Sequence, residues 1–331
     1  MKIVFTYEHY FPPFDEGVKN LAHMIHQQLA RSHDVQVMRY FGSTPNTINS
    51  LLIVPRLINK IIWFRPEKII FIPQAALTFS SIIKIFTLQL LFPGKVTVVG
   101  VQKRGLSPWQ TRVVKQLKLS SVFVLSSAMA EHLKQLGITA SILNVGIDLD
   151  RYCPVNDVDA LRNRYKIPTT KPVVLHVGHI KESRNIRWLL EVQKVLPDVQ
   201  VVIVGSTTTE QDIDLSTQLE GAGIIVLREY LSEIQELYQL ADVYCFTVMK
   251  DDGAMEIPLS VLEGMATNLP VITTRFGRLP ELFSEDEYYR YVSSADDIIR
   301  ILKSGFDNDC ENRAKMHQYT WQSTSENLLA I

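Results

Sequence analysis

The feature that most constrains the fold is a regular alternation between short β-branched runs and segments of helical length. Strands are predicted at Lys2–Thr6, Val35–Tyr40, Lys68–Ile72, Lys95–Val101, Ser121–Leu125, Ala140–Leu143, Pro172–Val177, Val199–Val204, Gly223–Leu227, Asp242–Phe246 and Pro270–Thr273. Such alternation is typical of parallel sheets covered by helices on both faces. Runs such as Val173–Val177 are almost continuously apolar, as expected for strands buried on both sides. The sequence therefore predicts an α/β protein with parallel sheets.

The length of 331 residues suits about two domains of ordinary size. One series of strands ends at Gly146–Pro154, and a helix is predicted directly afterwards at Asp157–Tyr165. We therefore expect the interdomain linker near Gly146–Arg151.

Composition narrows the class of protein. A hydrophobic fraction of 46% excludes a disordered chain. The three cysteines, at positions 153, 245 and 310, are too few and too scattered for a disulfide scaffold or a structural zinc site. The amino-terminal sequence lacks the layout of a signal peptide, and no clean apolar span of about 20 residues occurs. These observations predict a cytoplasmic protein.

The net charge of -1 conceals an uneven distribution. Residues 1–150 carry 16 Lys and Arg against 8 Asp and Glu, a net charge of +8, which leaves −9 for the remainder. A basic run with two aromatic residues could dock on an anionic membrane, and a merely solvated basic surface is the equal alternative. Likewise, the apolar helix predicted at Ala75–Leu91 could lie on a bilayer or pack on a sheet. The basic run comprises Arg56, Lys60, Arg65, Lys68, Lys84 and Lys95, with Trp63 and Phe64.

Common motifs for nucleotide, zinc and acyl-transfer chemistry do not occur. The chain has no G-x-G-x-x-G after the first strand, no G-x-x-x-x-G-K-[ST], no H-E-x-x-H, no Cys-x-x-Cys and no G-x-S-x-G. His23 and His26 have the spacing of metal ligands on the helix predicted at Val18–Ala30. Since no third ligand lies nearby, an ordinary helix face is the expected outcome, and no metal site is predicted.

The densest chemical signal lies between Asp251 and Thr274. Pro258 suits the first position of a helix, where its missing N–H costs nothing. The free N–H groups of Leu259, Ser260 and Val261 would then form an anion site. Glu263 follows among apolar residues, and its carboxylate suits a vicinal diol, which can donate two hydrogen bonds. The alternative is that Glu263 pairs with a basic residue of the scaffold.

This segment resembles the retaining glycosyltransferases of the family-4 type, which have two facing Rossmann-like domains (the GT-B fold) and an E-x7-E motif. The second acid matches Glu263, and the residues that follow match at Leu269-Pro270-Val271 and Gly277-Arg278-Leu279-Pro280-Glu281. Met255 occupies the position of the first acid. Glu256, one residue closer to Glu263, is therefore expected to contact the donor sugar, and the resemblance assigns Glu263 to the ribose diol.

A second landmark of the family is a Gly-Arg-Leu-x-x-x-Lys-Gly loop that holds the donor diphosphate. It corresponds to Gly178–Asn185, with His179 in place of the Arg and Arg184 in place of the Lys. The resemblance implies that Gly178, His179, Lys181 and Arg184 bind the diphosphate. Arg184 can do so in a bidentate manner and stabilise the charge that develops on the leaving group.

Further matches lie in the first domain and at the end of the chain. Gln102 occupies the position at which the family usually has a His near the reacting sugar, and the segment from Phe11 to Val18, with Gly17, resembles the loop that approaches the donor phosphates. The segment Tyr319–Leu329 resembles the family's closing helix, which returns to the first domain. The resemblance thus divides the chain into an acceptor-side domain at 1–150, a donor domain at 151–310 and a closing segment at 311–331.

The activity implied is transfer of a sugar from a UDP- or GDP-linked donor to a glycan or lipid-linked acceptor, with retention of configuration. The nucleotide sugar is a substrate, and neither a cofactor nor a metal is expected. Because Met255, His179 and Gln102 depart from the family pattern, a non-catalytic glycosyltransferase-like binding subunit is the alternative, and a nucleotide-sugar epimerase is a third reading. Nucleic acid is not an expected partner, because no recognition motif accompanies the basic charge.

Overall fold

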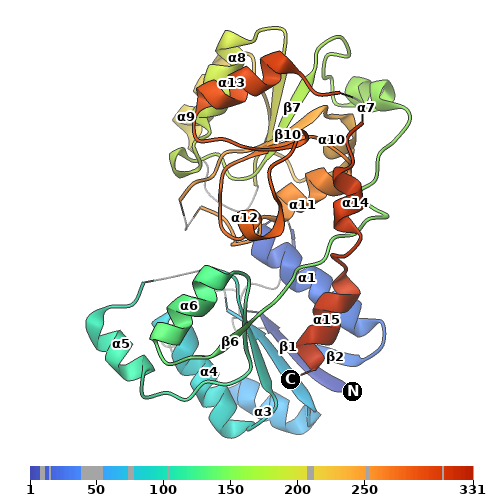
Figure 1. The fold of residues 1–331 in the computed structure, drawn as a ribbon. Coiled ribbons are helices and arrows are strands. Elements are labelled where there is room, and N and C mark those ends of the chain that lie inside the picture. Colours follow the sequence, from blue (N-terminus) through green and yellow to red (C-terminus); the bar gives the residue numbers. More distant parts are fainter. Residues whose placement is uncertain are drawn as a thin grey trace. The chain divides into compact units, whose positions relative to one another are not determined.

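The computed structural model describes residues 1–7, 12–14, 16–38, 55–73, 78–102, 105–206, 212–250, 253–307 and 309–330. The chain forms two compact units (Figure 1). Unit 1 comprises Met1–Gly146, Met255–Ile257 and the chain from Thr320 onward, and unit 2 comprises Ile147–Ala254 and Pro258–Tyr319.

Unit 1 is built on a parallel sheet with the strand order β2-β1-β3-β4-β5-β6. Its strands are β1 (Lys2–Tyr7), β2 (Asp34–Met38), β3 (Lys68–Ile72), β4 (Val96–Gly100), β5 (Val122–Val124) and β6 (Ala140–Ile142). Its described helices are α1 (Gly17–Ala30), α3 (Pro55–Phe64), α4 (Phe79–Leu91), α5 (Pro108–Val114), α6 (Ser127–Gln135) and α15 (Trp321–Leu329). The strand order reverses between β1 and β3.

Unit 2 contains a second parallel sheet with the order β12-β11-β10-β7-β8-β9. Its strands are β7 (Val173–Val177), β8 (Gln200–Val204), β9 (Ile225–Leu227), β10 (Val243–Phe246), β11 (Val271–Thr273) and β12 (Tyr289–Tyr291). Its helices are α7 (Val158–Arg164), the short 3₁₀ helix η1 (Glu182–Arg184), α8 (Arg187–Val195), α9 (Ile213–Gly221), α10 (Gln235–Leu240), α11 (Leu259–Ala266), α12 (Leu279–Leu282), α13 (Ala295–Ser304) and α14 (Asn312–Met316). The order reverses between β7 and β10.

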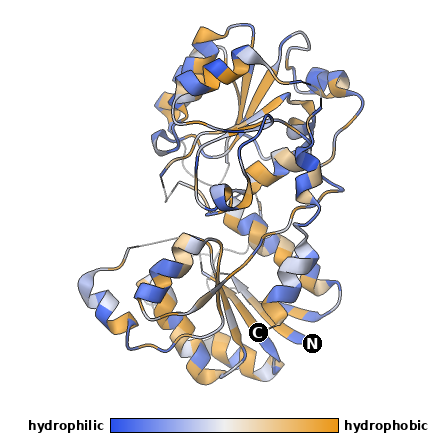
Figure 2. Cartoon of the chain, in the orientation of Figure 1, coloured by the Kyte–Doolittle hydropathy of each residue, from blue (hydrophilic) through white to orange (hydrophobic). Residues whose placement is uncertain are grey.

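The predicted α/β class with parallel sheets is confirmed. The central strands β3, β4 and β8 are buried along their whole length, and hydrophobic residues colour much of both sheets (Figure 2). The helix predicted at Ala75–Leu91 is described from Thr78 and packs on the first sheet, because Ile82, Ile85 and Leu88 of α4 belong to the core of unit 1. Among the described residues, no helix is long and apolar enough to cross a membrane.

The structure differs from the sequence-based expectation at two places. Strand β12, at the edge of the second sheet, was not predicted, because its Tyr-Arg-Tyr sequence is short and interrupted by a charge. The basic run is not wholly on the surface: Lys68 and Lys84 are buried, and burial lowers the pKa of Lys68. Long lysine stems can pack along apolar surface, so charge counted along the sequence overstates the charged surface.

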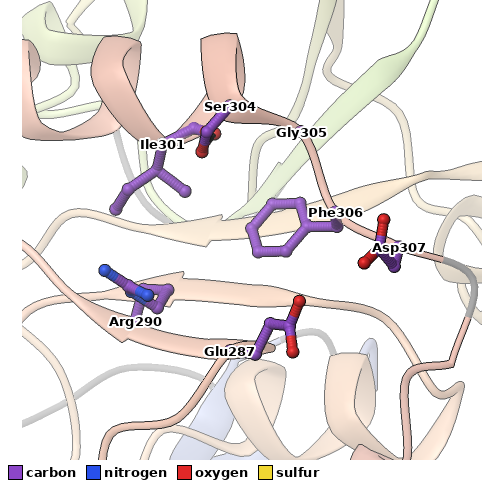
Figure 3. Close-up of a pocket in the computed structure, with 7 residues that line it drawn as sticks. All are labelled: Glu287, Arg290, Ile301, Ser304, Gly305, Phe306 and Asp307. Atoms are coloured by element: carbon purple, nitrogen blue, oxygen red, sulfur yellow. Dashed lines mark hydrogen bonds between the residues drawn. The ribbon is translucent and has the colours of Figure 1, made fainter.

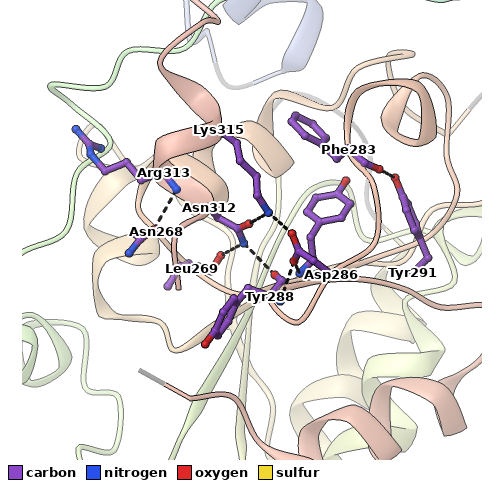
Figure 4. A network of polar contacts seen from close by, with 10 residues as sticks. Asn268, Leu269, Phe283, Asp286, Tyr288, Tyr291, Asn312, Arg313 and Lys315 are labelled. Carbon is purple, nitrogen blue, oxygen red and sulfur yellow. Dashed lines mark hydrogen bonds and ion pairs between the residues drawn. The ribbon is translucent and has the colours of Figure 1, made fainter. Parts of the chain in front are cut away.

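The end of the chain is tied to each unit by specific contacts. In unit 2, Asn312 at the start of α14 donates to the carbonyls of Leu269 and Tyr288, and Lys315 pairs with Asp286 (Figure 4). In unit 1, a Cβ on Gly146 would lie only 2.2 Å from the backbone nitrogen of Trp321, the first residue of α15. Only glycine allows the two backbones to approach so closely.

Candidate donor site

The carboxyl ends of β7 and β10 meet where the strand order of the second sheet reverses. In open parallel sheets, ligands bind outside the strand ends at such a position. Gly178 follows β7, and Thr247 follows β10. The site residues that the sequence predicts in this unit gather here: Gly178, His179, Lys181, Arg184, Leu259, Ser260 and Glu263 lie in the loop after β7 or on α11.

The loop after β7 is fixed by hydrogen bonds to the segment that follows β10. Asn185 has a left-handed backbone with φ of 55° and donates from its amide to the carbonyl of Thr247, 2.9 Å away. The Thr247 hydroxyl in turn donates to the carbonyl of Arg184 at 2.7 Å. Asn tolerates this backbone better than most residues, so it can stand where the family has Gly. These two hydrogen bonds hold the backbone of the loop at Arg184.

The Arg184 side chain is buried, with 9% of its surface exposed, and its terminal nitrogen lies close to Gly178. Its Nε donates to the carbonyl of Gly253 at 2.8 Å. A Cβ on Gly178 would lie 2.0 Å from Nη1, so the glycine makes room for the guanidinium. Burial lowers the pKa of Arg184 to about 10, and the guanidinium is therefore charged at neutral pH. Its terminal nitrogens have no hydrogen-bond partner among the described residues, which suits an anion site.

Helix α11 begins one residue later than the sequence suggests. Pro258 caps the helix, with φ of −67° and ψ of 115°, and Leu259 is the first helical residue. The fixed φ of proline suits either position, so ψ decides between them. Contrary to expectation, the N–H of Val261 is not free, because it donates to the carbonyl of Pro258 at 3.1 Å. Leu259 and Ser260 are left as the backbone donors at this end of α11.

Glu263 is buried and binds two tyrosines. The Tyr152 hydroxyl donates to Oε1 at 3.0 Å, and the Tyr238 hydroxyl donates to Oε2 at 2.6 Å. Burial raises the pKa of the Glu263 carboxyl, and the two tyrosine hydrogen bonds oppose that shift. The scaffold partner considered from sequence, a basic residue, is replaced here by the two hydroxyls. Each carboxylate oxygen retains a further lone pair for a ribose diol, so the diol contact stays a prediction.

The remaining predicted site residues belong to unit 1. A Cβ on Gly17, the first residue of α1, would lie 3.4 Å from Cε of Met255. Glu256 is buried, and its backbone N–H donates to the carbonyl of Val101 at 3.3 Å, which places it beside Gln102. The structure thus brings Gly17 together with Met255, and Glu256 with Gln102. Their contacts with a donor sugar and its phosphates remain predictions.

Other candidate sites have ordinary environments. His23 stacks on Phe14 with a centroid distance of 4.0 Å, and burial lowers its pKa. No group of three potential metal ligands occurs within the described part of the chain. A surface pocket with a volume of about 250 Å³ lies between β12 and α13, lined by Glu287, Arg290 and Phe306 among others (Figure 3). It contains none of the predicted site residues.

Residues 157–322, half of the chain, match the family model described as glycosyl transferases group 1. The chain belongs to this family. The predicted relationship to retaining glycosyltransferases of the family-4 type is thereby confirmed.

Individual relatives agree with this assignment. The sulfoquinovosyl transferase SQD2 of Arabidopsis thaliana is 25% identical over 252 residues, which cover 72% of this chain and 48% of the relative. The putative teichuronic acid biosynthesis glycosyltransferase TuaC of Bacillus subtilis is 24% identical over 60% of this chain and 56% of its own. The chain therefore spans about half the length of the curated relatives it matches.

Solved structures support the GT-B fold over the whole chain. A glycosyltransferase from Rickettsia africae has a TM-score of 0.77 at 14% identity, and 99% of this chain and 96% of the other are covered. Anabaena HepE in complex with UDP and glucose has a TM-score of 0.75 at 14% identity, with 99% and 98% covered. At these identities the likeness concerns the fold.

Sequence reasoning missed three side chains of this site: Tyr152, His176 and Tyr238. All three are buried. The signal for His176 was available, since it is the one polar residue within the run Val173–Val177. Nothing local to Tyr238 marks it as a partner of Glu263, which lies 25 residues further along.

Proposed function

We propose that this protein transfers a sugar from a nucleotide-sugar donor to a glycan or lipid-linked acceptor with retention of configuration. UDP-sugars are the first donors to test. The observation that carries the proposal is the buried, charged Arg184 guanidinium at the strand-order reversal of the second sheet. Within the described part of the chain no carboxylate pairs with Arg184; a buried cation without a counter-charge is costly, and a diphosphate would supply that charge. HepE, which shares the fold, was solved with UDP-glucose.

The chemistry assigns different tasks to the residues of the site. Arg184 and the N–H groups of Leu259 and Ser260 stabilise the charge that develops on the leaving diphosphate. His179 and Lys181, both half-buried in the same loop, add further donors. Glu263 holds the ribose diol. The proposal needs no general base from the chain, because the leaving phosphate can take the acceptor proton.

In the first unit, Glu256 and Gln102 are proposed to hydrogen-bond hydroxyls of the transferred sugar, and Gly17 to admit the donor phosphates. The burial of Glu256 supports this role, because a buried carboxylate binds hydroxyl donors strongly. Gln102 can orient a hydroxyl but cannot carry a proton.

A transfer assay tests the proposal. Purified protein is incubated with UDP- and GDP-sugars and a set of glycan and lipid-linked acceptors, and nucleoside diphosphate release and product configuration are measured. We expect acceptor-dependent release and a retained anomeric configuration, both lost in Arg184→Ala. Donor binding without any transfer would favour the non-catalytic alternative, and donor isomerisation without acceptor would identify an epimerase.

For the acceptor side, we propose that unit 1 docks on an anionic membrane. Trp63, at the end of α3, is 87% exposed, and Leu90, at the end of α4, is 70% exposed. Helix α3 leads into β3 and helix α4 into β4. Because these two strands are adjacent and parallel, the carboxyl ends of both helices lie toward the amino ends of the strands. The exposed cations Lys60 and Arg65 flank Trp63. Exposed apolar side chains next to cations are typical of interfacial membrane binding.

Vesicle sedimentation tests this docking. We expect the protein to bind phosphatidylglycerol vesicles more tightly than phosphatidylcholine vesicles, and Trp63→Ser to weaken the binding severalfold. Ile213→Ser is the matched control, because Ile213 is 77% exposed but lies on unit 2. Equal binding by the wild type and the Trp63 variant would contradict the assignment. A cytoplasmic protein docked peripherally is the location that this proposal implies.

A further inference from the structure

A fully buried histidine lies beside Arg184 in the core of the donor site. His176 is the fourth residue of β7 and has no exposed surface. A buried polar group that lacks a hydrogen bond destabilises the fold, so such groups nearly always have partners. The two ring nitrogens of His176 therefore need to be considered one at a time.

The proton of His176 is on Nδ1. This nitrogen lies 2.9 Å from the carbonyl oxygen of Cys245 on the neighbouring strand β10. Because a carbonyl only accepts, Nδ1 must donate, and in the neutral ring Nε2 then carries a lone pair. Burial, reinforced by the nearby Arg184, lowers the pKa of His176 to about 4, so the ring is neutral near pH 7. Nε2 is an acceptor, and it has no partner among the described residues.

The neighbour of this acceptor is the Arg184 guanidinium. A Cβ on Gly178 would lie 2.0 Å from Arg184 Nη1 and 3.3 Å from His176 Nε2, so the two nitrogens border the same small space. Arg184 uses Nε to bind the carbonyl of Gly253, and its terminal nitrogens make no hydrogen bond within the described residues. The terminal N–H groups of Arg184, which have no acceptor among the described residues, therefore lie near His176 Nε2, which has no donor among them. A rotation of the guanidinium within the space beside Gly178 would join them.

We propose that His176 is a positioning residue for Arg184. In the donor-bound protein its Nε2 accepts a hydrogen bond from one terminal nitrogen of Arg184, so that Nε, held by Gly253, and this nitrogen fix the guanidinium plane. The other terminal N–H groups then point to the diphosphate. The neutral ring is essential, because an imidazolium has no acceptor and would repel the guanidinium. The inference rests on the proposed function, since it concerns the residue that is to hold the donor diphosphate.

Tyr244 offers a competing partner. Its hydroxyl, on β10, is also buried, and both Ser260 and Arg184 are near enough to influence its pKa. If Tyr244 positioned Arg184 instead, its hydroxyl would be needed and Nε2 would not. Tyr244→Phe therefore separates the two arrangements.

The experiment uses a pair of histidine variants in the full chain. His176→Asn keeps an N–H near the position of Nδ1 and removes the acceptor at Nε2, whereas His176→Gln places an amide oxygen near Nε2. Calorimetry measures affinity for UDP and for uridine, and thermal unfolding monitors the fold. We expect His176→Asn to weaken the affinity for UDP about tenfold and to leave the affinity for uridine unchanged. His176→Gln should restore most of the lost UDP affinity, and Tyr244→Phe should bind UDP like the wild type.

The inference is overturned if His176→Asn binds UDP like the wild type, if it weakens UDP and uridine equally, or if Tyr244→Phe alone reproduces the loss. A second measurement does not depend on which nucleotide the protein binds. The ¹⁵N resonance of His176 Nε2, measured with inorganic pyrophosphate present, should move when Arg184 is replaced by Ala. If the wild type binds no nucleoside diphosphate, the proposed function fails, while an unmoved Nε2 resonance would refute the role of His176 separately.

Discussion

Gly178→Ala is the sharpest perturbation of the candidate donor site, because it adds one methyl group beside Arg184. The new Cβ would lie 2.0 Å from Nη1, far inside van der Waals contact, so the guanidinium must move. Displacing it from the diphosphate removes a hydrogen bond to a charged group, which contributes about 1.5–3 kcal/mol. Since about 1.4 kcal/mol corresponds to a tenfold change in affinity, UDP should bind roughly 10- to 150-fold more weakly.

A double-mutant cycle distinguishes this mechanism from a general loss of stability. UDP affinity is measured by calorimetry for the wild type, Gly178→Ala, Arg184→Ala and the double variant. If the alanine acts by moving Arg184, it should have almost no further effect once Arg184 is gone. Unchanged affinity in Gly178→Ala would refute the reasoning. So would equal losses in the presence and absence of Arg184.

Three further predictions concern stability. Asn185→Ala should cost about 1–2 kcal/mol in urea unfolding, because φ is 55° there, whereas Asn185→Gly should cost less; equal costs would contradict the backbone argument. Tyr238→Phe removes a donor to the buried Glu263 and should cost about 1.5–3 kcal/mol at neutral pH, and a neutral outcome would contradict a structural role for that contact. Because the folded-state pKa of Glu263 is raised, the free energy of unfolding of the wild type should fall relative to that of Glu263→Gln as pH rises above 4.5. Urea unfolding from pH 4 to 8 measures this difference, and a relative increase in wild-type stability would contradict the prediction.

The strands and the location of the candidate donor site follow from local sequence. Runs such as Val173–Val177 are apolar over their length, and in a parallel sheet that pattern identifies a buried strand and the ligand edge that follows it. Glu263 and Arg184 could be proposed from sequence because they stand in motifs with recognisable neighbours. Both lie on segments that follow the two central, adjacent strands β7 and β10 of the second sheet.

What could not be predicted depends on contacts between distant parts of the chain. Tyr152 and Glu263 are 111 residues apart, and no local pattern connects them. Lys68 and Lys84 are charged in sequence but buried by tertiary packing. The cap at Pro258 differs from the expected first helical position only in ψ, which the proline ring does not fix.

The most direct test of the central claim is a nucleotide-sugar panel read by thermal shift. Bound ligand raises the unfolding temperature according to its concentration and affinity, so one panel reports base and sugar together. We expect one UDP- or GDP-sugar to stabilise the wild type, and the shift to disappear in Arg184→Ala. If no nucleotide sugar shifts the wild type at millimolar concentration, or if Arg184→Ala shifts equally, the assignment of this site to a nucleotide-sugar donor is wrong.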